Sequence, residues 1–463
     1  MTVCYSCTIK DEDLYIADDT MTLHWSFGQE MLLLKIEHQY VIVLYVVYQL
    51  AWFDNDRAAS IVLINRMTTN TEIYFIVTDH ILSRLPVQSL LRFKCVCKNW
   101  NKLINTSSFI EKHFNSESNR LRLMITKFGL NYHKNPCVRP FDTYLLPDKI
   151  FSGCVPTHKL IYHGEDVGDV RGIYGPIDGL FLLEKGHYID NGRFGWWNPA
   201  TKECRLTPRV FFEVEDGLKD NDRRIGIGID LATHDYKIIW IRTYWNDNES
   251  DIFPKVYAAV YSTKNDSWKH LEPNFSHECQ ICMSSQHCTY KNGMYYWIST
   301  SKKYIAEGIN VYFIRTFDFS TELFGEFEGP PIPGEHWVTL FLRGGSIATM
   351  SSKDVTQAMT AFYDIWVNIR GNNWIKVYTV NPPITNHLCI GIWEYDKFIY
   401  ELTPSCKVLF YDQTTKQVTS LGFEFDGIGF GSCCVLSYKE SLVPIRKEKP
   451  SEKDNIEYFM VDY

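Results

Sequence analysis

The chain has 463 residues, of which 22% are charged and 15% are aromatic, and its formal net charge is −8. This length accommodates two or three domains with sizeable cores, and this composition is that of an ordered globular protein. The acidic balance argues against general nucleic-acid binding.

Residues 1–66 are predicted to form an N-terminal extension with little recognisable pattern. Its first residues, MTVCYSCTIKDEDLYIADD, lack the basic start and apolar core of a signal peptide. The 14 cysteines of the chain are scattered, which favours free thiols and a cytoplasmic or nuclear location. The apolar run from Tyr40 to Phe53 has 14 residues, whereas a membrane span needs about 20. We therefore expect a buried β-segment or a poorly ordered extension rather than a membrane helix.

The stretch ILSRLPVQSLLRFKCVCKNWNKLI, from Ile81 to Ile104, has helical rather than alternating periodicity. The apolar residues on one helical face are Phe93, Val96, Cys97, Trp100, Leu103 and Ile104. Because proline is tolerated only in the first turn of a helix, Pro86 predicts that one helix ends near Arg84 and a second begins near Pro86. Further on, Ser108 to Glu111 has capping-box spacing ahead of another short helix.

These elements predict a helical module over residues 67–116 with more apolar side chains than so small a unit can enclose, which indicates a partner protein. Between Glu72 and Lys112, six basic residues against three acidic ones give a charge of +3, so the rest of the chain carries −11. A basic module suits an acidic partner.

After a polar linker at residues 115–120, the pattern changes to short strands separated by Gly, Pro, Asn and Asp turns. A unit recurs in which a strand end is followed by a polar turn and another apolar residue. Its anchors are Trp197, Tyr261, Phe317, Val367 and Tyr411, spaced 64, 56, 50 and 44 residues apart. Asp, Asn, Ser and Thr favour tight bends, so each unit is predicted to be a hairpin.

A second element, a turn residue followed by an apolar strand, precedes many of these hairpins. Examples begin at Asp178-Gly179, Asn292-Gly293 and Tyr395-Asp396. Strand, connection and hairpin every 45–60 residues is typical of propeller blades. We therefore predict a mainly β chain: a small α module, then a β-propeller of six to eight blades over residues 121–446, then a polar tail at residues 447–463.

Sequence motifs for catalysis are missing: the chain has no G-x-S-x-G, no phosphate-binding glycine loop and no H-E-x-x-H. The segment from His277 to Cys288 has some zinc-ligand spacing, but its second half lacks the paired ligands of a structural site. We expect no catalytic residues, no metal and no cofactor.

Two acidic clusters in turn-rich stretches are the candidate substrate-binding residues. One interpretation is that they are solvated loops that aid solubility; the other is that they steer a basic protein substrate. The residues are Glu213, Glu215, Asp216, Asp220, Asp222, Asp247, Glu249 and Asp251.

The helical stretch resembles an F-box in ILSRLP (residues 81–86), VQSLLRFKCVCKNW (residues 87–100) and FIEKH (residues 109–113). Where F-boxes usually open with a Leu-Pro pair and an acidic residue, this chain has Ile73-Tyr74-Phe75. The resemblance implies docking onto the Skp adaptor, and through it onto a cullin. The adaptor-binding residues it implies are Ile81, Leu82, Leu85, Pro86, Leu90, Leu91, Phe93, Val96 and Trp100.

The repeats resemble the F-box-associated domain of plant F-box proteins, a kelch-like propeller, in GPIDGLFLL (residues 175–183), WNPATKECRL (residues 197–206) and KNGMYYW (residues 291–297). Within that family the chain is most similar to S-locus F-box proteins. The resemblance implies a non-catalytic receptor of an SCF (Skp–cullin–F-box) ubiquitin ligase that recruits a target for degradation, with basic S-ribonucleases of pollen self-incompatibility as one candidate. The alternatives are an interaction scaffold with a non-binding F-box, and a propeller enzyme or glycan-binding module.

Overall fold

The computed structural model divides the chain into two compact units, Met1–Asn119 and Arg120–Tyr463. The residues that it describes are 21–26, 31–36, 39–42, 82–95, 98–116, 118–128, 141–146, 158–160, 170–185, 192–246, 254–275, 279–281, 289–301, 311–332, 336–353, 362–384, 387–393, 396–402, 405, 407–424 and 433–445.

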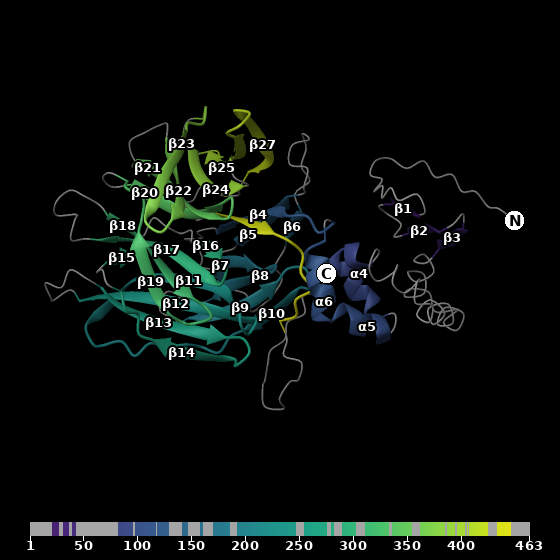
Figure 1. Cartoon of the computed structure of the whole chain (residues 1–463), viewed down its shortest axis with the longest axis horizontal. Coiled ribbons are helices and arrows are strands. Elements are labelled where there is room, and N and C mark those ends of the chain that lie inside the picture. The colour runs from purple at the N-terminus through teal and green to yellow at the C-terminus, as the bar shows by residue number, and fades with distance from the viewer. Residues whose placement is uncertain are drawn as a thin grey trace. The chain divides into compact units, whose positions relative to one another are not determined.

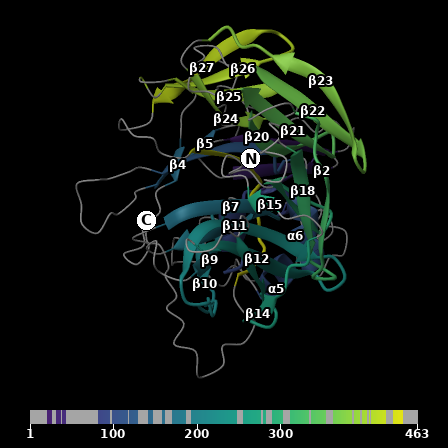
Figure 2. The same cartoon turned by 90° about the vertical axis from the view of Figure 1, so that its left-hand side faces the viewer.

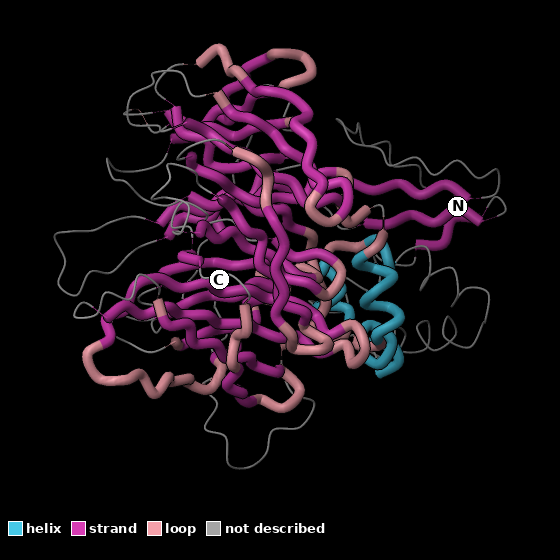
Figure 3. The backbone as a smooth tube through the Cα atoms, turned by 60° about the vertical axis from the view of Figure 1, so that its left-hand side comes forward, coloured by secondary structure: helices cyan, strands magenta, loops and turns pink. Residues whose placement is uncertain are grey.

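The first unit contains a small antiparallel sheet and a group of short helices (Figure 3). The sheet has the order β1 (Met21–Ser26), β2 (Met31–Ile36), β3 (Gln39–Ile42). The apolar run that begins at Tyr40 thus starts in a strand, and its remainder lies outside the described residues. None of the helices in the described ranges is both long and apolar enough to span a membrane.

The helical part consists of one 3-10 turn and three α-helices: η2 (Leu82–Arg84), α4 (Val87–Phe93), α5 (Lys98–Ile104) and α6 (Ser107–Phe114). Pro86 is the N-cap of α4, so the break after Arg84 is confirmed. The predicted cap of the last helix, Ser108, is wrong by two residues. Thr106 is the cap, because its Oγ1 accepts a hydrogen bond from the Phe109 N–H at 3.3 Å.

Two contacts hold these helices to one another. The Nε2 of His113 on α6 lies 2.8 Å from the carbonyl oxygen of Leu85, which follows η2, so this ring nitrogen donates the hydrogen bond. The rings of Phe93 and Trp100 meet at 5.5 Å between centroids and so join α4 to α5.

The second unit is a β-propeller: its described strands form six antiparallel sheets, within the predicted range of six to eight blades (Figures 1 and 2). Blade 1 has β7 (Val170–Ile177), β8 (Leu180–Lys185), β9 (Arg193–Asn198) and β10 (Glu203–Leu206). Blade 2 has β11 (Leu218–Asp230), β12 (Asp235–Asn246), β13 (Lys255–Ser262) and β14 (Ser267–Leu271). Blade 3 has β15 (Cys279–Ile281), β16 (Thr289–Lys291), β17 (Met294–Ser301), β18 (Val311–Asp318) and β19 (Phe324–Glu328).

The remaining blades follow the same order, except that the last is completed from both ends of the unit. Blade 4 has β20 (His336–Arg343), β21 (Ser346–Lys353), β22 (Tyr363–Arg370) and β23 (Asn373–Val380). Blade 5 has β24 (His387–Trp393), β25 (Lys397–Leu402), β26 (Lys407–Asp412) and β27 (Gln417–Glu424). Blade 6 has the order β28 (Cys433–Tyr438), β4 (Arg122–Phe128), β5 (Phe141–Leu146), β6 (His158–Leu160).

The ring closes at blade 6, where β28 pairs antiparallel with β4. The first strands of neighbouring blades contact one another around the ring, as β7 contacts β11 and β28 contacts both β24 and β7. After β28 the chain runs onto blade 1, where the Asn198 Nδ2 donates to the carbonyls of Ser441 and Val443, each at 3.0 Å.

The predicted hairpins are confirmed at all five anchors, because each turn joins the last two strands of a blade. In three of them the first turn residue is Asn198, Asp318 or Asp412, whose Oδ1 accepts two backbone N–H hydrogen bonds. The last turn residue in these three is Lys202, Glu322 or Lys416, each with a positive φ between 57° and 60°.

The turn between β7 and β8 in blade 1 and the turn between β16 and β17 in blade 3 are tighter. Asp178-Gly179 has φ values of 47° and 77°, and Asn292-Gly293 has 49° and 79°. Positive φ at both central residues is the type I′ geometry whose twist matches paired strands.

Neighbouring blades pack through aromatic and aliphatic side chains, and β11 comes especially close to blade 3. A Cβ added to Gly226 would lie 2.6 Å from the Tyr295 ring, and one added to Gly228 would lie 2.0 Å from the Phe319 ring. In the sequence, Gly226-Ile227-Gly228 within a strand pattern predicts close packing of blades, and these distances confirm it.

Candidate functional site

The helical part of the first unit is the first candidate binding surface. Of the nine residues expected to contact an adaptor, Ile81 and Val96 lie outside the described residues. Pro86 is exposed and Leu91 is half-buried. The other five are buried: Leu82, Leu85, Leu90, Phe93 and Trp100.

The residues expected to contact an adaptor thus fall into two groups, buried side chains and accessible ones. The buried side chains hold the helices together, as the Phe93–Trp100 ring contact and the His113–Leu85 hydrogen bond show. Pro86 and Leu91 present apolar surface beside them. Leu103 on α5 and Ile110 on α6 are also half-buried. Sequence reasoning placed Leu103 on the helical face but did not include either residue among the contacts.

The same helical part carries positive charge that is not buried. The six basic residues of the module are exposed or half-buried: Arg84, Arg92, Lys94, Lys98, Lys102 and Lys112. These six positive charges are therefore accessible to an acidic partner.

One end of blade 2 is the second candidate surface. Neighbouring strands are antiparallel, so the β11–β12 and β13–β14 turns lie at one end of this sheet and the start of β11 lies at the other, which we term the loop end. Leu218 pairs with Asn246 at the loop end. The first acidic cluster, Glu213 to Asp222, thus lies beside the end of β12. The other expected residues, Asp247, Glu249 and Asp251, follow β12 in the sequence and lie outside the described residues.

Nearby basic side chains neutralise much of the first acidic cluster. Residues far apart in the sequence form these ion pairs, except for one neighbouring pair on β11. The pairs are Glu215 with Lys255 at 2.5 Å, Asp220 with Arg242 at 2.6 Å and Asp222 with Arg224 at 3.3 Å. The local field is therefore weaker than the count of carboxylates indicates.

Glu213 and Asp216 remain as exposed carboxylates, and within the described ranges no basic side chain lies within ion-pair distance of either.

The ion pair between Asp220 and Arg242 is firmly held, since the Arg242 guanidinium also lies 5.3 Å from the Trp240 ring and 5.2 Å from the Tyr244 ring. Burial raises the pKa of Tyr244, which keeps its hydroxyl protonated.

A residue that sequence reasoning missed lies beside these carboxylates. Phe211 is 53% exposed, although its neighbours Val210 and Phe212 pack inward. The Phe212 ring lies 4.7 Å from that of Trp240. Two consecutive phenylalanines in a β-rich sequence resemble core positions, and only the alternation of burial along this segment separates one from the other.

The structure shows no cluster for metal binding in the described ranges: no group of three or more His, Cys, Asp or Glu side chains there could hold an ion. Cys279 begins strand β15, and the remainder of the zinc candidate, residues 277–278 and 282–288, lies outside the described residues.

Comparison with known protein families gives two matches in this chain. A family model described as "F-box associated beta propeller domain" matches residues 159–445, which is more than half of the chain. A model described as "F-box domain" matches residues 77–112, which contain η2, α4, α5 and most of α6.

Curated relatives are F-box proteins of Arabidopsis thaliana. An F-box/kelch-repeat protein is 28% identical over 298 residues, covering 62% of this chain and 69% of that protein. An F-box protein is 28% identical over 259 residues, and the chain spans 58% of its length. A putative F-box/kelch-repeat protein is 22% identical over 404 residues, covering 81% of this chain and 93% of its own.

Among solved structures, a putative 6-phosphogluconolactonase from Bacteroides fragilis has a TM-score of 0.36 and 9% identity, over 70% of this chain and 99% of that one. Similarity at this level bears on neither mechanism nor substrate.

Proposed function

The chain belongs to the F-box-associated β-propeller family and has an F-box domain ahead of its propeller, and from this premise we propose that it is the substrate-recognition subunit of an SCF ubiquitin ligase. The F-box binds the Skp adaptor and, through it, a cullin. The propeller holds a target protein for ubiquitination and proteasomal degradation. The occurrence of both domains in one chain, as in the curated F-box/kelch-repeat relatives, is the observation that carries this proposal.

In this role the protein supplies no catalytic group of its own. It acts by raising the effective concentration of the target's lysines near the ubiquitin-charged enzyme elsewhere in the complex. We place the complex in the cytoplasm or nucleus as part of the same proposal, because the 14 scattered cysteines of the chain suit free thiols in a reducing compartment.

The adaptor contact is assigned to the apolar surface around Pro86 and Leu91. The buried residues Leu85, Leu90 and Trp100 shape this surface from beneath, so truncating them would unfold the module as well as weaken docking. Exposed positions therefore give the sharper test.

The test is binding of the full chain to recombinant Skp adaptor by isothermal titration. Leu91→Glu should weaken binding about tenfold or more, because a central apolar contact is replaced by a charge at an acidic partner's surface. Pro86→Ala should weaken it less. Leu323→Glu is the matched control, since Leu323 is 66% exposed on the propeller and undergoes the same change.

The outcomes separate this proposal from the scaffold alternative. The absence of binding by the unmodified chain at micromolar concentration would favour a scaffold whose F-box, with Ile73-Tyr74-Phe75 at its start, does not engage the adaptor. Binding that Leu91→Glu leaves unchanged would move the interface elsewhere on the module.

For the substrate, we propose the narrower class of basic proteins, with the S-ribonucleases of pollen self-incompatibility as the specific candidate. The exposed Glu213 and Asp216 at the loop end of blade 2 support it. The three ion pairs nearby reduce the field available to steer a partner, so the effect rests on these two carboxylates.

The double variant Glu213→Lys with Asp216→Lys should slow association with a basic S-ribonuclease, measured by stopped flow, and the difference should shrink at high salt. Glu328→Lys, an exposed carboxylate on β19, is the control. Equal rates for all three proteins, or expression absent from pollen, would remove this substrate.

A further inference from the structure

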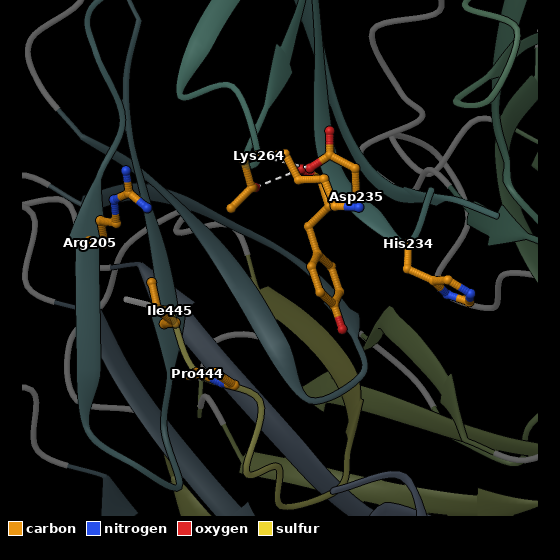
Figure 4. Close-up of a pocket in the computed structure, with 8 residues that line it drawn as sticks. Arg205, His234, Asp235, Lys264, Pro444 and Ile445 are labelled. Atoms are coloured by element: carbon orange, nitrogen blue, oxygen red, sulfur yellow. Dashed lines mark hydrogen bonds between the residues drawn. The ribbon is translucent and has the colours of Figure 1, made fainter. Parts of the chain in front are cut away.

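A pocket of about 210 Å³ lies within the propeller, at the turns of blade 2 (Figure 4). Four segments of the chain build it. They are strand β10, the two turns of blade 2 and the segment that follows β28. The lining residues are Arg205, His234, Asp235, Tyr236, Thr263, Lys264, Pro444 and Ile445.

Two cationic side chains, Arg205 and Lys264, belong to the polar part of this lining. The Arg205 side chain is only 8% exposed and, among the described residues, pairs with Asp266, whose Oδ2 lies 2.8 Å from the Arg205 Nη2. A guanidinium has five N–H donors, so it retains donors for a ligand. The Lys264 Nζ donates to the carbonyl of Thr233, and in the described part of the chain no carboxylate lies within ion-pair distance of it.

The one carboxylate in the lining is already occupied. Asp235 Oδ2 accepts from the Ser262 hydroxyl at 2.5 Å, and Oδ1 accepts from the Lys264 N–H at 2.9 Å (Figure 4). The Asp266 carboxylate beside Arg205 likewise accepts from the Tyr261 hydroxyl at 2.6 Å. These acids are held by hydrogen bonds within the protein, whereas no carboxylate of the described residues lies within ion-pair distance of the Lys264 ammonium.

Pro444 and Ile445 form an apolar wall on the side of Arg205, opposite Lys264 and Asp235 (Figure 4). This wall is fixed, because the Ile445 N–H donates to Glu203 Oε2 at 3.2 Å and Asn198 holds the residues before it. The Tyr236 hydroxyl donates to Asp178 Oδ2 at 2.9 Å, so the ring stays in place. The His234 ring points away from Arg205 (Figure 4).

We propose that this pocket binds one anionic side chain of a partner polypeptide, a phosphorylated serine or a glutamate, between Arg205 and Lys264. The volume suits a single side chain rather than a cofactor. The guanidinium and ammonium groups recognise an oxyanion, and the apolar wall takes the methylene groups that an inorganic ion lacks. This site lies at the turns of blade 2, apart from the acidic loop end, and the proposal stands independently of the ligase function.

The test uses the full chain and small probes by isothermal titration: N-acetyl-phosphoserine methylamide, N-acetyl-glutamate methylamide, the neutral N-acetyl-glutamine methylamide and inorganic phosphate. One of the two anionic amides should bind saturably, and the glutamine amide should not. The comparison between phosphoserine and glutamate identifies the group.

Lys264→Gln should weaken that binding about fivefold or more through loss of a charge-assisted contact. Lys416→Gln is the matched control, an exposed lysine at the corresponding turn of blade 5. Arg205→Gln should weaken it further, and circular dichroism checks that this buried position has kept the fold.

Three results would each overturn the proposal: no saturable heat from either anionic amide at millimolar concentration, equal losses in Lys264→Gln and Lys416→Gln, or inorganic phosphate binding more tightly than both amides. The last would show an inorganic-anion site without recognition of a side chain.

Discussion

Gly226 and Gly228 show how single positions set the distance between blades. Both lie on β11, and aromatic rings of blade 3 occupy the space where their side chains would be. The sequence pattern identified the place, because glycine within an apolar strand indicates close approach. It could not identify the rings, since Tyr295 and Phe319 belong to the next blade.

Gly228→Ala should lower the free energy of unfolding by about 1–3 kcal/mol, because the new methyl group would overlap the Phe319 ring and force both strands apart. The measurement is urea denaturation followed by tryptophan fluorescence. Gly195→Ala is the control: the nearest atom to its added Cβ would be the end of the Leu206 side chain at 3.3 Å. An equal loss in the two variants would show that overlap with the ring is not the cause.

His387 makes the propeller sensitive to acid. Burial lowers the pKa of His387, and a backbone contact with Ile384 offsets this only in part. The neighbouring rings are those of Tyr400, 4.8 Å away, and Tyr363, 6.1 Å away, so neither supplies a counter-charge.

The direction of the pH dependence follows from the lowered pKa of His387. A histidine that is harder to protonate when folded takes up protons preferentially when unfolded, so stability is complete above the unfolded pKa of about 6.5 and declines as pH falls below it. The urea midpoint of unfolding should decrease as the pH is lowered from 7.5 to 5.5, and the decrease should be smaller in His387→Phe. The exposed His270→Gln should leave the slope unchanged. Parallel slopes for wild type and His387→Phe would assign the acid sensitivity to other groups.

At the scale of elements, hairpins were the most predictable part of the chain. The turn at Asp412 is specified by its own residues, since its carboxylate accepts N–H bonds from Thr414 and Thr415. The ion pairs of the acidic cluster were not predictable in this way. Lys255 and Arg242 reach Glu215 and Asp220 from other strands, and one sequence gives no register between strands.

Asn198 combines a local and a distant function, and a matched pair of variants can separate them. Asn198→Ala loses the turn bonds and also the bonds to Ser441 and Val443. Asp412→Ala loses only the equivalent turn bonds. We expect Asn198→Ala to cost about 1–3 kcal/mol more in free energy of unfolding, because the buried carbonyl of Ser441 and the partly buried carbonyl of Val443 lose their donor. Equal costs would show that the segment after β28 contributes nothing through this contact.

At the scale of the whole molecule, the number of blades and their closure lay beyond the sequence pattern. Spacing near 45–60 residues indicated repeats, but the six-blade count depends on β28, which comes from the C-terminal end and pairs with β4. The sequence of β28, CCVLSY, does not show whether this strand begins a seventh blade or joins the sheet of β4, β5 and β6.

Deleting residues 425–463 should therefore abolish cooperative unfolding of the propeller, because β4 loses its partner strand and the ring stays open. Deleting only residues 446–463 keeps β28 and the bonds to Asn198. Calorimetry should show one sharp transition for the shorter deletion and none for the longer. A sharp transition in both would mean that five blades and an open sixth suffice.

The pairing of β28 with β4 also determines when the propeller can close during synthesis. About 300 residues separate β4 from the strand that pairs with it, and at roughly 5–20 residues per second the ribosome takes about 15–60 s to make them. For that interval β4 has an open edge, the kind of strand that pairs with other chains. Mispairing with other chains and binding by chaperones are thus most favoured in the interval between the synthesis of β4 and the synthesis of β28.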